Sequence, residues 1–255
     1  MPTQAPVHIG TSGWHYTHWR GPFYPDDLGA DRFLTYYATC FSTVEINNSF
    51  YRLPSEQALR AWRDIAPPGF IFAVKASRFI THMKKLQDPE RSLAPFLERI
   101  VLLGERLGPI LFQLPPRWHF DVARLAAFLT ALPATYRYTL ELRDRSWIND
   151  RALDLLSVHG VAFCIYELDG YLSPQEVTAD FVYIRLHGPG GPYQGRYDHR
   201  TLSAWAKVIA AWSRQGREVF CYFDNDEAGY AAQNALELQD LLVNGGDTPV
   251  DGGGE

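Results

Sequence analysis

The sequence alternates apolar segments of strand length with segments whose apolar residues recur at helical spacing, and it does so eight times. The predicted strands cover residues 7–9, 43–47, 70–75, 110–114, 138–143, 161–166, 181–187 and 218–223. Strands that alternate with helices form parallel sheets through right-handed crossovers. Eight such units without a domain break therefore predict an α/β fold, a single TIM-type (β/α)8 barrel. An open doubly wound sheet is the alternative fold.

The helical pattern varies in strength along the chain. The predicted helices cover residues 31–41, 54–66, 89–107, 122–132, 150–159, 201–215 and 229–243, with Gly108 and Pro109 ending the third. The segment 167–180 is short and broken by proline, so the sixth helix is expected to be reduced. One barrel domain is predicted over residues 1–243, and a tail rich in Gly and Asp, 244–255, is predicted to be disordered.

Composition narrows the class of protein. The chain has 255 residues and 46% hydrophobic content, which suffices for one sizeable core. A formal net charge of −5 argues against extended duplex nucleic acid or an anionic membrane as a partner. No signal peptide or membrane-spanning segment is predicted, and three widely spaced cysteines suggest neither a disulfide framework nor a zinc site. A cytoplasmic protein is expected, in an oligomeric state that the sequence leaves open.

Polar residues end most of the predicted strands. Glu45 and Asn47 stand two residues apart and therefore share one face of the second strand. Polar side chains on the inner face of a buried strand are costly unless they are used. The other polar endings are Lys75, Gln113, Glu141, Arg143, Arg185, His187, Asp224 and Asn225. The carboxyl ends of barrel strands carry the active site in TIM-type enzymes, so these residues predict a ligand site there.

The residue types at these positions suggest an anionic ligand. Lys75, Arg143 and Arg185 match a phosphate or carboxylate group, so phosphate, a nucleotide or a phosphosugar is the expected partner. Glu45, Glu141 and His187 are the predicted catalytic residues, because carboxylates and imidazole transfer protons. The alternatives are structural ion pairs, such as Glu141 with Arg185, and a hydrogen-bonded core histidine at position 187.

Aromatic residues in the predicted loops form a second group on the same side of the barrel. They could stack on a sugar or a base, or pack as a lid or a second core layer. The predicted ligand-binding residues are Trp14, Tyr16, Asn47, Lys75, His82, Gln113, Arg143, Trp147, Arg185, Tyr193, Tyr197 and Asn225. The glycine-rich segment 188–195 lacks the lysine of a phosphate loop and is expected to be a mobile loop over the site.

A metal site is an alternative interpretation of the same strand ends. Glu45, Glu141, His187 and Asp224 are all possible ligands of a hard or borderline ion. The histidines show neither HxxxH nor HxH spacing, and the nearby Lys and Arg side chains would repel a cation. No metal and no cofactor are therefore predicted, although a metal-dependent phosphodiesterase or nuclease stays open.

Seven motifs identify a family resemblance: GTSGWHYTHWRGPFYP, VEINNSFYRLP, FAVKASRFITH, ILFQLPP, LELRDRSW, YIRLHGPGGPYQGRY and CYFDNDEAGYAAQNA. Together they resemble the YecE-like family, known as domain of unknown function 72, from about residue 9 to residue 242. The resemblance implies a TIM-type barrel and no established activity. The chain departs from the family at Asp224, since YFDND stands where such proteins often have YFNND.

Three functional classes follow from these observations. The first is an enzyme, hydrolytic by expectation, that acts on a small anionic substrate at the carboxyl-terminal mouth of the barrel. A glycosidase is disfavoured, because the carboxylates of the large barrel glycosidase group come from strands four and seven, and here those strands end in Gln113 and Arg185. The alternatives are a non-catalytic protein that binds an anionic metabolite and a protein-interaction scaffold.

Overall fold

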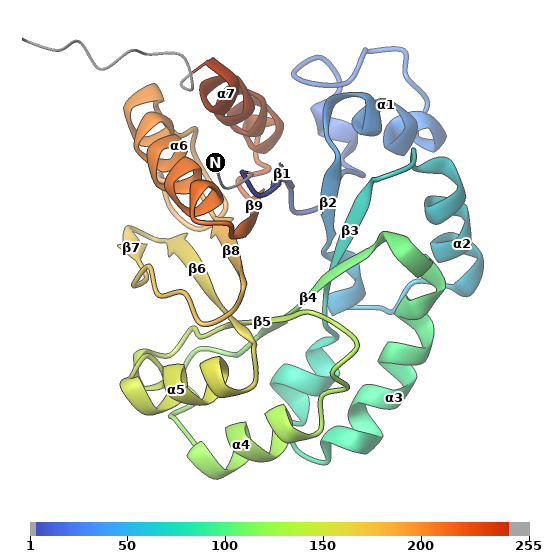
Figure 1. Cartoon of the computed structure of the whole chain (residues 1–255). Coiled ribbons are helices and arrows are strands. Elements are labelled where there is room, and N and C mark those ends of the chain that lie inside the picture. Colours follow the sequence, from blue (N-terminus) through green and yellow to red (C-terminus); the bar gives the residue numbers. More distant parts are fainter. Residues whose placement is uncertain (1–3, 245–255) are drawn as a thin grey trace, which may run out of the picture.

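The computed structural model describes residues 4–244, and in them eight parallel strands form a nearly closed barrel (Figure 1). The strands are β1 (Val7–Thr11), β2 (Thr43–Ile46), β3 (Ile71–Lys75), β4 (Leu107–Gln113), β5 (Tyr138–Glu141), β6 (Ala162–Leu168), β8 (Phe181–Leu186) and β9 (Glu218–Phe223). Their order around the barrel is β1-β9-β8-β6-β5-β4-β3-β2. The predicted TIM-type barrel is thereby confirmed.

Seven α-helices surround the strands in the described part of the chain (Figure 1). They are α1 (Phe33–Cys40), α2 (Glu56–Ile65), α3 (Pro89–Ile100), α4 (Val122–Thr130), α5 (Asp150–Val158), α6 (His199–Arg214) and α7 (Tyr230–Asn244). Four of them begin after a side chain that accepts a hydrogen bond from the backbone N–H three residues later: Ser55, Asp121, Asn149 and Asp198. Such caps satisfy N–H groups that the first helical turn leaves free.

The third helix is shorter than predicted, and the fourth strand begins earlier. A 3-10 segment, Val101–Arg106, follows α3, and the backbone at Gly104 turns out of the helix with φ 59° and ψ −133°. Gly108 and Pro109 lie inside β4 instead of ending a helix. A Cβ atom at Gly108 would lie 2.4 Å from Ile71 Cγ2, so glycine permits the close approach of β4 to β3.

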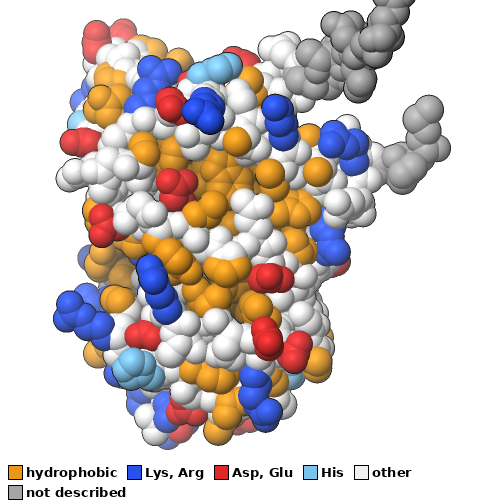
Figure 2. Space-filling view, turned by 90° about the vertical axis from the view of Figure 1, so that its left-hand side faces the viewer, with side chains coloured by type: hydrophobic (Ala, Val, Ile, Leu, Met, Phe, Trp, Pro, Cys, Tyr) orange, Lys and Arg blue, Asp and Glu red, His pale blue; other side chains and the backbone are white. Residues whose placement is uncertain are grey.

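A hairpin replaces the sixth helix, as the broken pattern of 167–180 predicted. Asp169 and Gly170 both have positive φ angles and return the chain to β7 (Tyr171–Leu172), which pairs with β6 in antiparallel orientation. A hollow of about 490 Å³ lies beside this hairpin and α6, and Leu172, Trp205 and Val208 line it. Figure 2 shows the face that carries these elements, with apolar side chains gathered near its centre.

A side-chain hydroxyl helps to close the barrel between β1 and β2. The hydroxyl of Tyr37 accepts a hydrogen bond from the backbone N–H of Thr11 at 2.9 Å and donates one to the carbonyl of Thr43 at 3.1 Å. A Cβ atom on Gly10 would lie 2.4 Å from that carbonyl oxygen, so only glycine fits there. We call this junction of Gly10, Thr11, Tyr37 and Thr43 the seam.

Side chains fill the interior of the barrel. The apolar part consists mainly of Ala73, Leu111, Ala162, Cys164, Tyr166, Phe181, Tyr183, Phe220 and Tyr222. At the amino ends of the strands, His8 Nε2 lies 2.8 Å from Glu218 Oε1 and the guanidinium of Arg137 lies over the ring of Phe220. These contacts fill the interior of the barrel at its amino end.

Two further predictions concern the tail at residues 244–255 and membrane-spanning segments. Asn244, the first residue of the predicted disordered tail, is the last residue of α7. The rest of that tail, 245–255, lies outside the described residues. Within residues 4–244, the helices are too short or too polar to span a membrane.

Candidate functional site

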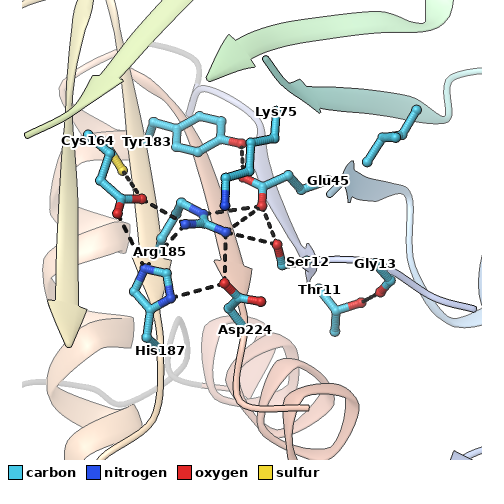
Figure 3. Close-up of polar contacts among 12 residues, drawn as sticks. Thr11, Ser12, Gly13, Glu45, Lys75, Cys164, Tyr183, Arg185, His187 and Asp224 are labelled. Atoms are coloured by element: carbon cyan, nitrogen blue, oxygen red, sulfur yellow. Dashed lines mark hydrogen bonds and ion pairs between the residues drawn. The ribbon is translucent and has the colours of Figure 1, made fainter. Parts of the chain in front are cut away.

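The guanidinium of Arg185 lies at the centre of the barrel mouth and contacts three carboxylates (Figure 3). Its Nη2 lies 2.8 Å from Glu45 Oε1 and 2.8 Å from Asp224 Oδ2, and its Nη1 lies 2.7 Å from Glu141 Oε2. The acids come from the ends of β2, β5 and β9, while Arg185 extends from β8. We call Arg185, Glu45, Glu141 and Asp224 the ion cluster. All four residues are buried, so the ion pairs are shielded from water.

Glu45 has both carboxylate oxygens occupied. Oε1 accepts hydrogen bonds from Arg185 and from the hydroxyl of Ser12, and Oε2 accepts one from the hydroxyl of Tyr183 at 2.6 Å. Ser12 Oγ in turn accepts from Arg185 Nη2 at 3.0 Å. These partners satisfy the carboxylate that burial would otherwise make costly. In this arrangement Glu45 orients Arg185.

Glu141 is held between two guanidinium groups. Arg143 Nε donates to Oε1, and Arg185 Nη1 donates to Oε2. Burial acts to raise the pKa of Glu141, but the two positive charges outweigh burial and hold this pKa well below its ordinary value. Glu141 therefore carries a negative charge at neutral pH and is not a proton donor there. The geometry contains the structural ion pair that the sequence left as an alternative.

His187 extends from the end of β8 toward the same cluster. Its Nε2 lies 3.1 Å from Arg143 Nη2 and 3.3 Å from Arg185 Nη1. A guanidinium only donates, so Nε2 is the acceptor, and in a neutral ring the proton sits on Nδ1. Nδ1 lies 3.0 Å from Asp224 Oδ2 but has no well-aligned hydrogen bond. The two arginines thus select the tautomer of a neutral His187 ring, in which the Nε2 lone pair is directed at them and Nδ1 faces Asp224.

Asp224 itself is influenced by burial and by charge. Burial acts to raise the pKa of Asp224, while Arg185 and His187 lower it, and the net pKa lies below the ordinary value. Asp224 is consequently ionised at neutral pH. Its contact with Arg185 at 2.8 Å shows that aspartate at this position suits the cluster.

Lys75 differs from the two arginines because no carboxylate in residues 4–244 lies within ion-pair distance of its ammonium group. The side chain projects from the end of β3 toward the ion cluster (Figure 3). Its Nζ lies 4.5 Å from the centre of the Phe50 ring, and the residue is 6% exposed. Burial, together with the charge of Arg185, lowers the pKa of Lys75 to about 8.

Three further predicted ligand-binding residues lie near Lys75 or at the adjoining strand ends. The His82 ring packs edge-on against Phe50 at 5.0 Å, and burial and the charges of Lys75, Arg78 and Arg143 lower the pKa of His82. Gln113 is buried at the end of β4. Asn47 follows β2, and its buried Oδ1 has no hydrogen-bond partner among the described residues.

Three other predicted residues have structural partners instead. The indole N–H of Trp147 donates to the carbonyl of Trp118. The hydroxyl of Tyr197 accepts from the N–H of Gly188 at 3.0 Å, and Asn225 donates to the carbonyl of Gly195 at 2.8 Å. These contacts hold the loops that form the mouth.

The remaining aromatic residues are divided between two walls of the mouth. Tyr193 packs edge-on over His187 at 5.5 Å, on the loop that follows β8. Trp14 is buried against Trp62, and Tyr16 donates its hydroxyl to the carbonyl of Ser12 at 2.8 Å. The mouth therefore has one aromatic wall after β1 and another after β8.

Sequence reasoning did not include Ser12, Tyr183, Phe50, Tyr51 and Trp62 among the site residues. Ser12 follows Gly10 by two residues and Tyr183 precedes Arg185 by two, so the period of a strand places each on the inner face. The rule that found Glu45 and Asn47 would have found these two. Tyr51 and Trp62 lie outside the strands and carry no such signal.

Metal binding has little support from the donor atoms. Within residues 4–244, no group of three or more His, Cys, Asp or Glu side chains could hold a metal ion. In the mouth, the three carboxylates converge on the guanidinium of Arg185. A cation placed between them would have to displace a charge of the same sign.

Nearly the whole chain is similar to known proteins. A family model described as "Protein of unknown function DUF72" matches residues 8–251. The UPF0759 protein YunF of Bacillus subtilis is 25% identical to this chain in an alignment 275 residues long. The alignment covers 92% of this chain and 94% of that protein.

Two solved structures of DUF72 family proteins are also similar to this chain. A DUF72 family protein of Thermotoga maritima, TM1631, has a TM-score of 0.86 and 30% identity over 93% of this chain and 99% of its own. A DUF72 family protein of Enterococcus faecalis, EF0366, has a TM-score of 0.81 and 20% identity over 93% of this chain and 95% of its own, and shows the shared fold.

Proposed function

Because the chain belongs to the DUF72 family of proteins of unknown function, we propose a function from the geometry of its barrel mouth. The protein is an enzyme that binds a small anionic substrate at the carboxyl ends of the strands. Lys75 and Arg143 contact the anionic group, and Glu141 of the ion cluster holds Arg143 in place. The substrate class is a phosphate-bearing or carboxylate-bearing metabolite.

The observation that carries this proposal is the unpaired state of Lys75. Arg185 already contacts three carboxylates, so its guanidinium has no capacity left for a ligand. Lys75 has three ammonium donors and no carboxylate partner, and Arg143 lies beside the same cluster with one carboxylate partner, Glu141. An anionic group would supply the missing partner and offset the cost of burying the ammonium.

The reaction that we assign to this site is hydrolysis of the bound substrate. A water molecule would form the new bond to the reacting phosphorus or acyl carbon while the bond to the leaving oxygen breaks. Lys75 would stabilise the negative charge that develops on the substrate and would protonate the leaving oxygen, and the proton that the water gives up would restore the ammonium group. With a pKa of about 8, raised further by a bound anion, the amine of Lys75 carries a proton at neutral pH and can donate it. Glu45 and Glu141 would act as positioning residues that fix the two arginines. His187 would keep the guanidinium of Arg143 aimed at the substrate.

Sulfate binding tests the anion site, because sulfate keeps its charge over the pH range in which Lys75 titrates. An anion beside Lys75 raises the pKa of this residue, so binding near pH 8 should take up protons. Calorimetry in buffers of different ionisation enthalpy measures that uptake. Lys75→Met should abolish both the uptake and most of the binding, while Lys84→Met, at a partly exposed lysine that pairs with Asp88, should change neither. Equal binding by wild type and Lys75→Met would remove Lys75 from the proposal.

Hydrolysis needs a separate test. A panel of phosphate esters, phosphosugars and nucleotides is incubated with wild type and Lys75→Met, and product release is measured. Turnover by wild type that falls at least tenfold in Lys75→Met, with Lys84→Met unaffected, is the expected result. Turnover that survives in Lys75→Met would contradict the assigned role.

A second candidate function is binding without catalysis. The observation that favours it is the full occupation of Glu45, Glu141 and Asp224 by Arg185, which leaves these carboxylates no free role in proton transfer. A compound from the panel that raises the melting temperature and is recovered unchanged would favour this candidate.

A further inference from the structure

A second hollow lies beside the ion cluster, on the aromatic wall that follows β1. It measures about 550 Å³, and its lining includes Trp14, Tyr16, Asn47, Tyr51 and Trp62. A volume of this size is in the range of small-molecule sites, and such sites combine apolar rings with a few polar groups. We call this hollow the aromatic pocket.

The rings of the aromatic pocket are of two kinds. Trp14 is buried and meets Trp62 edge to face, with ring centres 5.0 Å apart at 87°. These two rings brace each other and form a fixed wall. Tyr51 is 73% exposed and contacts Phe50 edge to face at 5.0 Å. Most of the Tyr51 ring is therefore free to stack on a ligand.

Asn47, which lines the aromatic pocket, has a buried side-chain oxygen, Oδ1, without a hydrogen-bond partner in the described part of the chain. Leaving such an acceptor unpaired is unfavourable, because it has lost its bond to water without gaining another. A ligand that carries an N–H or O–H donor would satisfy it. The pocket thus combines an aromatic surface with one hydrogen-bond acceptor.

One short turn connects the aromatic pocket to Lys75. The 3-10 turn Asn48–Phe50 follows Asn47, and the hydroxyl of Ser49 donates to the carbonyl of Lys75 at 2.5 Å. Phe50 lies under the ammonium of Lys75, and its neighbour Tyr51 lines the pocket. A single ligand could therefore reach the ammonium on one side of the turn and the rings on the other.

We propose that the aromatic pocket binds the base of a nucleoside monophosphate whose phosphate contacts Lys75 and Arg143. This inference rests on the proposed anion site and names the substrate class for it. A nucleobase is planar, stacks on tyrosine and tryptophan, and carries N–H donors suited to Asn47 Oδ1. The ribose spans the turn between the two subsites.

Four probes separate the two parts of the ligand: AMP, adenosine, ribose 5-phosphate and glucose 6-phosphate. Calorimetry gives their affinities for wild type, Tyr51→Ala and Phe79→Ala. Tyr51 is exposed, so its removal should leave the fold intact, and Phe79 is a matched control that is 43% exposed and lines no part of the aromatic pocket. AMP should bind wild type at least tenfold more tightly than ribose 5-phosphate does.

The two variants then test whether Tyr51 causes the difference in affinity between AMP and ribose 5-phosphate. Tyr51→Ala should weaken AMP by about tenfold or more, as expected for the loss of a stacked ring. It should leave ribose 5-phosphate unchanged, and Phe79→Ala should leave both unchanged. Equal affinities of AMP and ribose 5-phosphate would overturn the base assignment, and so would a preference for glucose 6-phosphate that depends on Tyr51.

The same measurements distinguish failure of this inference from failure of the anion site. If ribose 5-phosphate binds and AMP gains nothing over it, the anion site stands and the base assignment fails. If adenosine binds in a Tyr51-dependent way while ribose 5-phosphate does not bind, the aromatic pocket stands and the anion site fails. If none of the four probes binds wild type, both are overturned.

Discussion

Arg185 directs two of its nitrogen atoms at one oxygen of Glu45, with Nη2 at 2.8 Å and Nε at 3.2 Å. Both side chains are wholly buried. The remaining nitrogen, Nη1, contacts Glu141. The guanidinium therefore acts as the common counter-charge of acids from different strands.

Removal of that counter-charge should be strongly destabilising. Arg185→Met would leave Glu45, Glu141 and Asp224 close together without their shared partner. We expect the free energy of unfolding to fall by about 3–5 kcal/mol, the usual effect of breaking a buried ion pair. Urea denaturation measures the change, with Arg151→Met, an exposed position on α5, as the control. Equal denaturation midpoints for Arg185→Met and wild type would contradict the prediction.

Acid should weaken the contribution of Glu141. Its pKa is well below the ordinary value in the folded state, so its contribution is fully present above the ordinary glutamate pKa of about 4.3. The contribution is lost as the pH falls from there through the folded pKa. The difference in unfolding free energy between wild type and Glu141→Gln should therefore shrink below about pH 4. A difference that stays constant down to about pH 3 would show that the charge of Glu141 is not the cause.

The buried ammonium group of Lys75 should lower the free energy of unfolding. Its pKa is about 8 in the folded state and 10.5 in a free side chain, so the unfolded chain holds the proton more tightly between these values. The contribution of Lys75 to the free energy of unfolding therefore rises as the pH increases from 8 to 10.5. Below pH 8 the protein is destabilised by the full amount. Lys75→Met should therefore stabilise the protein at pH 7 by about 1–3 kcal/mol. Melting curves at pH 7 and pH 10 test this, and the gain should be smaller at pH 10.

The seam offers a test of how the barrel is closed. Tyr37→Phe removes the hydroxyl that joins Thr11 N to the carbonyl of Thr43 and leaves two buried backbone groups without that partner. We expect a loss of about 1–3 kcal/mol in unfolding free energy. Tyr36→Phe, one residue earlier on α1, is the control and should have a smaller effect. Equal effects of the two substitutions would show that the seam does not depend on this hydroxyl.

Much of the fold was predictable because one pattern recurs eight times. Each strand shows its apolar run, and the proline-broken segment 167–180 indicated that the sixth helix is reduced. The error at Gly108 and Pro109 has a physical cause. These residues usually end a helix, but here tertiary packing places them in β4, where glycine permits close contact with Ile71.

The position of the candidate site at the strand ends was predictable, but the ion pairs within it were not. The strand ends showed that Glu45, Lys75, Glu141 and Arg185 would converge. They did not show that Arg185 would be enclosed by acids while Lys75 stays unpaired, because that difference depends on side-chain distances of a few ångströms. Trp147 and Tyr197 illustrate the same limit, since a buried partner decides whether a ring can reach a ligand.

The pairing of β1 with β9 has a consequence for the synthesis of the chain. Val7 to Thr11 pair with Val219 to Phe223, so the strand made first acquires this ladder partner only when β9 has been made. Until then, the partners of β1 are those on β2 and α1, through the seam and the bond of Ser12 to Glu45, and Asp224 is still missing from the mouth. Contacts of such large sequence separation form late and slow folding. A nascent chain that ends before β9 therefore has neither the ladder partner of β1 nor the complete set of acids around Arg185.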